Sequence, residues 1–263
     1  MILDYHMHLV DDDDPYTDEI LSEDRIGEYV TAAERAAVDE IGFTDHVFRF
    51  SVARDWVDHP LWTADGVNDL AAYHGCVSAA RDAGMPVKVG LEVDYVAGRE
   101  DAIRAALDPF EWDFLLGSVH WIDGLAVDSS PNAGVWAEWP VEEVWRRYFE
   151  ALAELAASGH VDVLAHPDLP KIFGRRPERI EYPPLAGVAL EISTNGRYKP
   201  VGELYPDLEL LHAAGLPVTL ASDAHVPENV GRDFELALEL ARAAGYETVT
   251  VFEGRTARQE PLG

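Results

Sequence analysis

The sequence predicts an α/β fold in which a parallel sheet or barrel is covered by helices. Three observations predict it: short apolar runs with little polar alternation, intervening segments with helical spacing of apolar residues, and glycine or proline at the ends of those segments. Continuous apolar runs are typical of strands that are buried on both faces, as in parallel sheets. Strands that alternate with helices along a whole chain predict right-handed crossover connections.

Seven runs have the length of a strand: Met1–Leu3, Glu40–Phe43, Val87–Val93, Phe114–Val119, Val161–Ala165, Gly187–Ile192 and Pro217–Ala221. The segments with helical spacing are Asp24–Glu40, Asp65–Ala83, Val141–Ala157 and Asn229–Ala244. Glycine follows several helical segments, at Gly84, Gly159 and Gly215, where left-handed C-caps are expected. No linker, repeat or low-complexity tract interrupts the pattern, so a single domain over residues 1–263 is expected.

Charge and composition exclude several function classes. The 263 residues include 20 Lys and Arg against 49 Asp and Glu, which gives a formal charge of −29. Such a charge repels phosphate backbones and anionic membrane surfaces, so neither a nucleic acid nor a membrane is an expected partner. Cys76 is the single cysteine, which rules out an internal disulfide and favours a reducing compartment. No signal peptide or membrane helix is evident, and a soluble, cytoplasmic protein is expected.

Residues that can bind metals follow most of the expected strands. In chain order they are His6 and His8, Asp45 and His46, Glu92, His120, His166, and Asp223 with His225. The carboxyl ends of barrel strands are where active sites are built. His6 and His8 are two residues apart on a strand, so both side chains point to the same face, and Asp223 and His225 repeat this spacing. Six imidazoles and at least two carboxylates exceed the needs of one tetrahedral ion, so two or three metals are expected.

A single histidine after a strand is more often a surface or core residue than a ligand, and four histidines fall outside the pattern. These are His59, His74, His160 and His212. Six of ten histidines at strand ends, with two same-face pairs, is a joint pattern that indicates a metal site.

These residues resemble the motifs of the PHP (polymerase and histidinol phosphatase) superfamily. The motifs are His6-Met-His8, Thr44-Asp45-His46, Gly90-Leu-Glu92, Gly117-Ser-Val-His120, Ala165-His166-Pro167 and Ser222-Asp223-Ala224-His225, and they extend over almost the entire chain. The stretches at 115–120, 162–169 and 191–206 are most similar to the stand-alone histidinol-phosphate phosphatases of that superfamily. The resemblance implies a distorted (β/α)7 barrel, TIM-barrel-like, with a trinuclear metal site at the C-terminal ends of the strands.

The resemblance also implies a ligand set. One metal would bind His6, His8, Glu92 and Asp223; a second would share Glu92 and bind His120 and His166; a third would bind His46, His225 and one residue from the loop after His8. Many members have a third histidine in that loop, whereas this chain has Asp11 to Asp14. Asp13 or Asp14 is the expected replacement, although the acidic run could equally be a solvated loop. The implied cofactors are two or three divalent ions, with Zn, Fe or Mn as candidates.

The implied reaction is hydrolysis of a small phosphate monoester, L-histidinol phosphate, to L-histidinol and phosphate, a step of histidine biosynthesis. A hydroxide that bridges two metals would attack phosphorus, and Asp223, His225 or His46 is the candidate general acid. Arg197 and one of Lys171 or Arg175 are candidate phosphate-binding residues. The alternative is a phosphoesterase of the same superfamily that acts on a nucleotide or another small phosphate ester. The sequence leaves the oligomeric state open.

Overall fold

Two parallel sheets form the centre of the protein in the computed structural model, which describes residues 1–11, 16–17 and 20–263. One sheet has the order β1-β2-β3 (Leu3–Met7, Glu40–Phe43 and Val87–Val89), and the other has the order β10-β9-β8-β5-β4 (Val218–Ala221, Ala189–Ser193, Val163–Leu164, Leu116–Ser118 and Glu92–Asp94). Every pairing within these two sheets is parallel. The α/β class with parallel strands is therefore confirmed.

The two sheets contact each other at two junctions. Beyond β1, the backbone N–H of His8 donates to the carbonyl of Ala224 at 2.8 Å, in a parallel bridge between Met7 and Ala224. Beyond β2, a second parallel bridge joins His46 to Glu92, at the first residue of β4. The C-terminal ends of β1, β2 and β10 and the beginning of β4 are thereby held beside one another.

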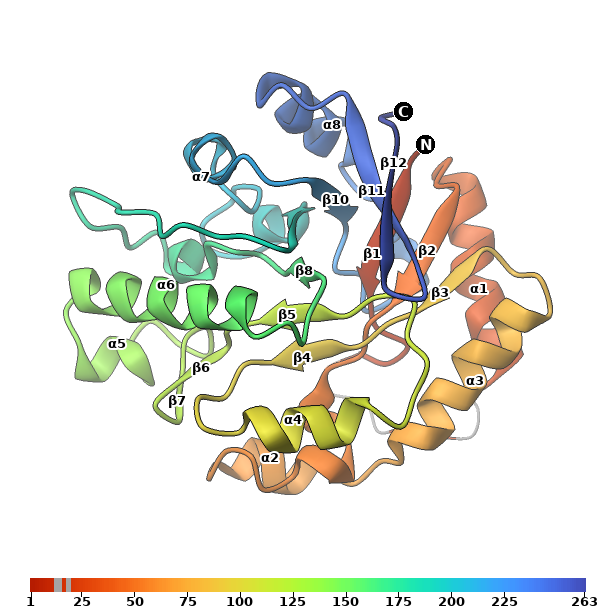
Figure 1. Cartoon of the computed structure of the whole chain (residues 1–263), viewed down its shortest axis with the longest axis horizontal. Helices are drawn as coiled ribbons and strands as arrows, with labels where there is room; N and C mark the ends of the chain where they lie inside the picture. Colours follow the sequence, from red (N-terminus) through yellow and green to blue (C-terminus); the bar gives the residue numbers. More distant parts are fainter. Residues whose placement is uncertain (12–15, 18–19) are drawn as a thin grey trace.

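Helices surround the strands on the outside of the molecule (Figure 1). They are α1 Glu23–Arg35, α2 Pro60–Asp65, α3 Leu70–Asp82, α4 Glu100–Leu107, α5 Val135–Glu138, α6 Val141–Ala157, α7 Leu208–Ala214 and α8 Phe234–Ala243. Short 3-10 helices lie at Val47–Arg49, Ser51–Ala53, Leu169–Phe173, Asn195–Tyr198 and Pro227–Asn229. Within the described ranges, no helix has the length and apolar character needed to cross a membrane.

Two antiparallel hairpins complete the fold. β6 (Trp121–Ile122) pairs with β7 (Leu125–Ala126), and β11 (Thr248–Glu253) pairs with β12 (Thr256–Pro261). β11 is buried along most of its length, whereas β12 is mainly exposed. The polar sequence of β12 explains why no apolar run predicts it, since its pairing with β11 and not a buried face makes it a strand.

The expected strands are confirmed with two corrections. The first strand is Leu3–Met7 and not Met1–Leu3, so His6 lies inside the strand. The polar residues Asp4 and His6 hid the strand in the sequence, and both are fully buried because they have hydrogen-bonding partners. The run Val87–Val93 forms two strands, because its first part pairs with β2 in one sheet and its last part pairs with β5 in the other. Gly90 lies between the two parts, where a Cβ would be 2.8 Å from Thr44 Cγ2.

The expected helices are confirmed, with shifted boundaries. α6 has the expected bounds, whereas α1 ends at Arg35 because Ala37 has a positive φ of 56°. The segment Asp65–Ala83 is interrupted at Gly66, and α3 begins after Asp69, whose side chain accepts a hydrogen bond from the N–H of Ala71. α8 begins at Phe234 and not at Asn229, since Gly231 and Asp233 have positive φ.

Candidate metal centre

Histidine and carboxylate side chains from distant parts of the chain meet at the C-terminal ends of the strands. They line a pocket of about 480 Å³, to which His46, His120, His166, Asp223 and His225 contribute. His6, His8 and Glu92 lie immediately behind this wall and are at most 1% exposed. Among the described residues, each expected ligand follows its strand by one to four residues, except His6 in β1 and Glu92 in β4.

The Glu92 carboxylate is the centre of this cluster. Its Oε2 lies 2.6 Å from His46 Nδ1 and 3.3 Å from His6 Nε2. Its Oε1 lies 3.2 Å from His166 Nε2 and 3.5 Å from His120 Nε2. One carboxylate thus faces four imidazoles, which is the arrangement expected of a ligand that bridges cations.

His6 and His8 extend from β1 toward the same site, as their spacing predicts. Their ring centroids are 5.1 Å apart. His6 Nδ1 lies 2.7 Å from Glu191 Oε2, which leaves Nε2 directed at Glu92 and at Asp223, 3.6 Å away. A carboxylate on the far nitrogen of a histidine fixes its ring and raises its basicity as a ligand.

His120 and His166 form a second side of the cluster. Their Nε2 atoms are 3.3 Å apart, and His120 Nδ1 is held by Asp94 Oδ1 at 2.8 Å. His166 has a positive φ of 28°, and Asp223 has one of 51°. Backbone strain of this kind in residues other than glycine is concentrated at functional sites, where it aims side chains.

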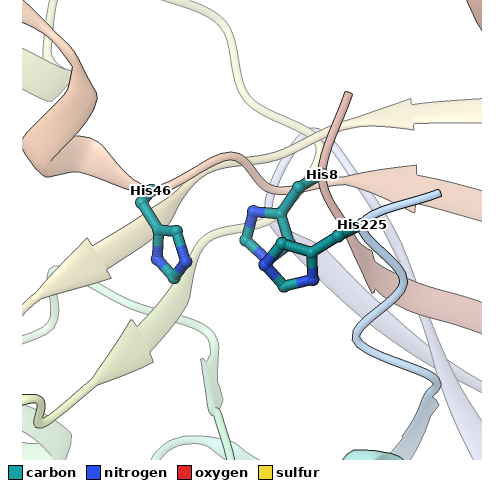
Figure 2. A group of neighbouring side chains, drawn as sticks. All are labelled: His8, His46 and His225. Atoms are coloured by element: carbon teal, nitrogen blue, oxygen red, sulfur yellow. The ribbon is translucent and has the colours of Figure 1, made fainter. Parts of the chain in front are cut away.

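His8, His46 and His225 form a third group, drawn in Figure 2. The His8 ring is stacked against each of the other two, with centroids 4.4 Å from His46 and 4.2 Å from His225, and the His46 and His225 centroids are 6.1 Å apart. The three rings come from three separate segments of the chain (Figure 2). Imidazole nitrogens are common ligands of zinc and similar cations, so three rings gathered in this way fit a cation site.

Asp223 is the last of the expected ligands that the structure describes. Its Oδ1 lies 3.2 Å from His8 Nε2, and its Oδ2 accepts a hydrogen bond from the Asn195 side chain. Arg232 in turn donates to Asn195 Oδ1 at 2.6 Å. Asn195 is thus held at both ends of its amide and fixes the orientation of the Asp223 carboxylate.

The surroundings set opposite pKa directions in the cluster. Burial alone would raise the pKa values of Glu92 and Asp223, but the neighbouring histidines outweigh it and hold both pKa values well below the usual range. Burial, reinforced by His225 and His46, lowers the pKa of His8. These directions favour ionised carboxylates and a neutral His8, which are forms that bind cations. Against the effect of burial, Glu191 raises the pKa of His6, and Asp94 raises that of His120 to about 10, so a cation would have to displace a proton from these two rings.

Several buried polar atoms of the cluster lack hydrogen bonds within the part of the chain that the structure describes. They are His6 Nε2, His8 Nδ1, Glu92 Oε2 and His166 Nδ1. Ligand atoms lie within 4.8 Å of one another in three groups: His8, His46 and His225; His6, His8 and Glu92; His46, Glu92 and His120. Nitrogen and oxygen atoms that offer lone pairs and lie this close together can bind divalent cations such as Zn, Fe or Mn.

The expected ligand from the acidic loop is not tested, because Asp13 and Asp14 lie outside the described residues. Asp11 is described, and its carbonyl accepts a hydrogen bond from Arg49 at 3.1 Å. The assignment of Asp13 or Asp14 remains a prediction.

The three candidate phosphate-binding residues have other partners. Lys171 is fully buried, with Nζ 2.8 Å from Asp168 and 2.6 Å from Asp207, so it cannot reach a ligand in this conformation. Arg197 pairs with Asp233 at 2.9 Å, and the Arg175 guanidinium lies 5.4 Å from the Trp136 ring centre. Lys199, two residues after Arg197, lines the pocket. A basic residue near the site in sequence thus need not face it, because acidic neighbours compete for its charge.

Sequence reasoning missed the buried polar residues that orient the ligands: Asp94, Glu191 and Asn195. Glu191 lies in the middle of β9 and is fully buried. The sequence does indicate a role for Glu191, because a carboxylate inside an apolar strand requires a buried polar partner. The backbone N–H of His166 also donates to Glu191, at 3.1 Å, so this residue holds two ligands at once.

Comparisons with known proteins agree with this geometry. The model of the PHP domain matches residues 17–198. A protein of Deinococcus radiodurans named "probable histidinol-phosphatase" is 35% identical over 236 residues, which cover 85% of this chain and 88% of the relative. One of the same name from Clostridium acetobutylicum is 24% identical and covers 97% of this chain and 98% of the relative.

A similar fold is found among solved structures. Histidinol phosphate phosphatase from Lactococcus lactis, solved in complex with Zn, L-histidinol and phosphate, superposes with a TM-score of 0.69 at 22% identity. The alignment covers 98% of both chains. The whole chain therefore has the fold of that structure.

Proposed function

Because this chain belongs to the PHP domain family, we propose that it is a metal-dependent histidinol-phosphatase, which hydrolyses L-histidinol phosphate to L-histidinol and phosphate. The observation that carries the proposal is the convergence on Glu92 of four histidines, one from within β1 and three that follow other strands. The 35% identity to a relative with that name supports the substrate.

We infer that the strands form the closed, distorted (β/α)7 barrel that the resemblance implies, with the metal centre at its C-terminal end. The bridge between Met7 and Ala224 and the bridge between His46 and Glu92 support closure, since they join the two sheets at both junctions. Barrels place catalytic residues at this end of the strands, where loops are free to vary.

The residues present fit two or three divalent ions, distributed as the resemblance implies. His6, His8, Glu92 and Asp223 would hold one ion, and Glu92, His120 and His166 a second. His46 and His225, with a residue of the acidic loop, would hold a third. Bound there, the ions would supply the Lewis acidity that activates a water and neutralises the charge on phosphate oxygens.

The remaining chemistry falls to side chains of this chain. The leaving alkoxide of the substrate needs a proton, and Asp223 is poorly suited to give it, because the surrounding histidines hold its pKa low. His225 and His46 both line the pocket and are the other candidates, but either could give a proton only while it does not hold the third ion, because a histidine that binds a metal is deprotonated. Lys199 lines the same pocket and is positioned to offset phosphate charge; Arg197 remains a candidate that would first have to leave Asp233.

Phosphate release from L-histidinol phosphate, measured with metal analysis of the same sample, tests the proposal. We expect release that a chelator abolishes and that added Zn, Fe or Mn restores. His8→Ala should abolish both metal binding and release, whereas His212→Ala, an exposed histidine outside the site, should change neither. Release that survives the chelator and His8→Ala would contradict the proposal, and faster release from a nucleotide would favour the alternative substrate.

A further inference from the structure

We propose that the pocket at the metal centre selects phosphate esters whose alcohol part carries a positive charge, and that Asp128 receives this charge. The inference rests on the proposed function, since it concerns the substrate of the same site. It names a specificity residue that lies outside the metal cluster.

Two carboxylates line the pocket without belonging to the cluster. Asp65, at the end of α2, and Asp128, just after β7, are both part of the pocket wall. Within the described ranges neither carboxylate forms an ion pair or accepts a hydrogen bond, and neither belongs to a group of possible metal ligands. By contrast, the other half-buried or buried carboxylates around the site have partners, as Asp94 and Glu191 do.

The position of Asp128 is fixed by the strand that carries a metal ligand. The N–H of Val127 donates to the carbonyl of His120 at 2.9 Å, and the Val127 carbonyl accepts from the Trp136 indole at 2.7 Å. The backbone on the N-terminal side of Asp128 is therefore held against the His120 segment. Its carboxylate stands at a defined place in the wall of the pocket and is not on a free loop.

Unpaired carboxylates are unfavourable in a pocket for phosphate unless the ligand also brings a positive charge. A phosphate monoester is an anion, and like charges in a partly desolvated pocket repel each other strongly. A cationic group on the alcohol part would turn this repulsion into attraction and set the direction in which the ester enters. Recognition by charge of this kind rejects ligands that lack the charge, because the carboxylate would then lose water without gaining a partner.

The hydroxyl of Tyr205 is a second, independent sign of a polar ligand in this pocket. Tyr205 lines the pocket, is only 2% exposed, and its hydroxyl has no hydrogen-bond partner within the described residues. Its ring is fixed between the His166 ring, with centroids 6.2 Å apart, and Lys171 Nζ, 5.2 Å from its centre. Buried hydroxyls normally have partners, so this one is set to bond with a bound molecule.

The apolar part of the wall suits a flat, cationic group. Phe48, Leu61 and Trp121 line the same pocket as Asp128, and Phe48 is stacked on His46 with centroids 4.8 Å apart. Aromatic faces attract ammonium and imidazolium groups, and the attraction grows when water is excluded. Carboxylate and aromatic groups together therefore select a cation over a neutral polar group.

The test compares a cationic with an uncharged substrate on the metal-loaded protein. The measured quantity is the ratio of kcat/KM for L-histidinol phosphate to kcat/KM for phenyl phosphate, in wild type and in Asp128→Asn. We expect the ratio to fall about tenfold to a hundredfold in Asp128→Asn, as for loss of one charge-assisted contact. Asp101→Asn, an exposed carboxylate of α4, is the matched control and should leave the ratio unchanged.

An unchanged ratio in Asp128→Asn, or a wild-type protein that prefers phenyl phosphate, would overturn the inference. The same assay with phosphoethanolamine separates this failure from failure of the proposed function. Suppose that wild type does not hydrolyse L-histidinol phosphate but prefers phosphoethanolamine to phenyl phosphate, and that Asp128→Asn loses this preference. That result would refute the histidinol assignment and would still support the inference about Asp128.

Discussion

The carboxylate of Asp4 accepts hydrogen bonds from both the backbone N–H and the hydroxyl of Ser222, at 2.8 and 2.5 Å. Asp4 lies in β1 and Ser222 directly follows β10, so this contact joins the edge strands of the two sheets. A third donor, the N–H of Gly231, lies 3.0 Å away. The contact fixes the two segments that carry His6 and Asp223 relative to each other.

Loss of the Asp4 carboxylate should destabilise the protein. Asp4→Ala leaves buried donors of Ser222 and Gly231 without an acceptor, at a cost of about 1–3 kcal/mol in the free energy of unfolding. Urea unfolding of the metal-free protein measures this cost. Glu239→Ala, an exposed position in α8, is the control and should stay within about 0.5 kcal/mol of wild type. Equal stability of the two variants would show that the contact between β1 and Ser222 is unimportant.

The same carboxylate should make stability depend on pH. Burial, only partly offset by the hydrogen bonds, raises the pKa of Asp4 from 3.8 to about 6. A raised pKa in the folded state means that the contribution of Asp4 to stability is full below pH 4 and is lost as pH rises to 6 and above, by about 3 kcal/mol. In metal-free samples, the free energy of unfolding of wild type should therefore fall relative to that of Asp4→Asn as the pH rises from 4 to 7. A constant difference would contradict the raised pKa.

Asp94 should matter for metal binding although it is not expected to bind the metal. Its Oδ1 holds His120 Nδ1 at 2.8 Å and so directs Nε2 toward Glu92. Asp94→Asn should lower metal affinity or activity about 10- to 100-fold, the usual effect of losing such a partner. Isothermal titration calorimetry, in which Zn is added to the metal-free variant and to metal-free wild type, measures the affinity of each protein for Zn. A variant with normal affinity would show that the His120 ring is oriented by other contacts.

Gly42 should not tolerate a side chain. A Cβ there would lie 2.6 Å from Phe114 Cζ, and the Phe114 ring is fully buried and stacked on Tyr5 at 4.6 Å, so it cannot move aside. Gly42→Ala should cost about 1–3 kcal/mol of stability. Gly75→Ala is the matched control: it meets open space in α3 and should stabilise the protein by about 0.5–1 kcal/mol. Chemical denaturation measures the free energy of unfolding of both variants. If Gly42→Ala is as stable as wild type, the core around Phe114 has room for an additional methyl group.

The sequence predicts the candidate metal ligands more completely than the residues that surround and orient them. Histidines at strand ends are visible in the sequence because strand ends are marked by apolar runs, and His120, His166 and His225 follow such runs. Asp94 and Glu191 were missed because their partners are distant in sequence, and only the fold brings His120 and His6 to them. The partners of the basic residues were hidden for the same reason, since nothing local reveals that Asp168 and Asp207 enclose Lys171.

The fold likewise has elements that local sequence predicts and elements that it does not. Buried parallel strands and α6 follow from local periodicity, which burial on fixed faces imposes. The helices α4 and α7 were not predicted because they have only 8 and 7 residues, and β12 was not predicted because its sequence is mainly polar. Polar residues inside β1 obscured a strand that tertiary hydrogen bonds stabilise.

The hairpin of β11 and β12 brings residue 263 back to residue 1 (Figure 1). The Met1 amino group donates to the carbonyl of Pro261 at 2.7 Å, and the N–H of Gly263 donates to the Met1 carbonyl at 3.2 Å. A linker of a few residues could therefore join these two positions, and new ends could be opened at the turn around Gly98. The same fold can therefore be reached from a different chain order, and a circularly permuted version would test whether folding depends on where the chain begins.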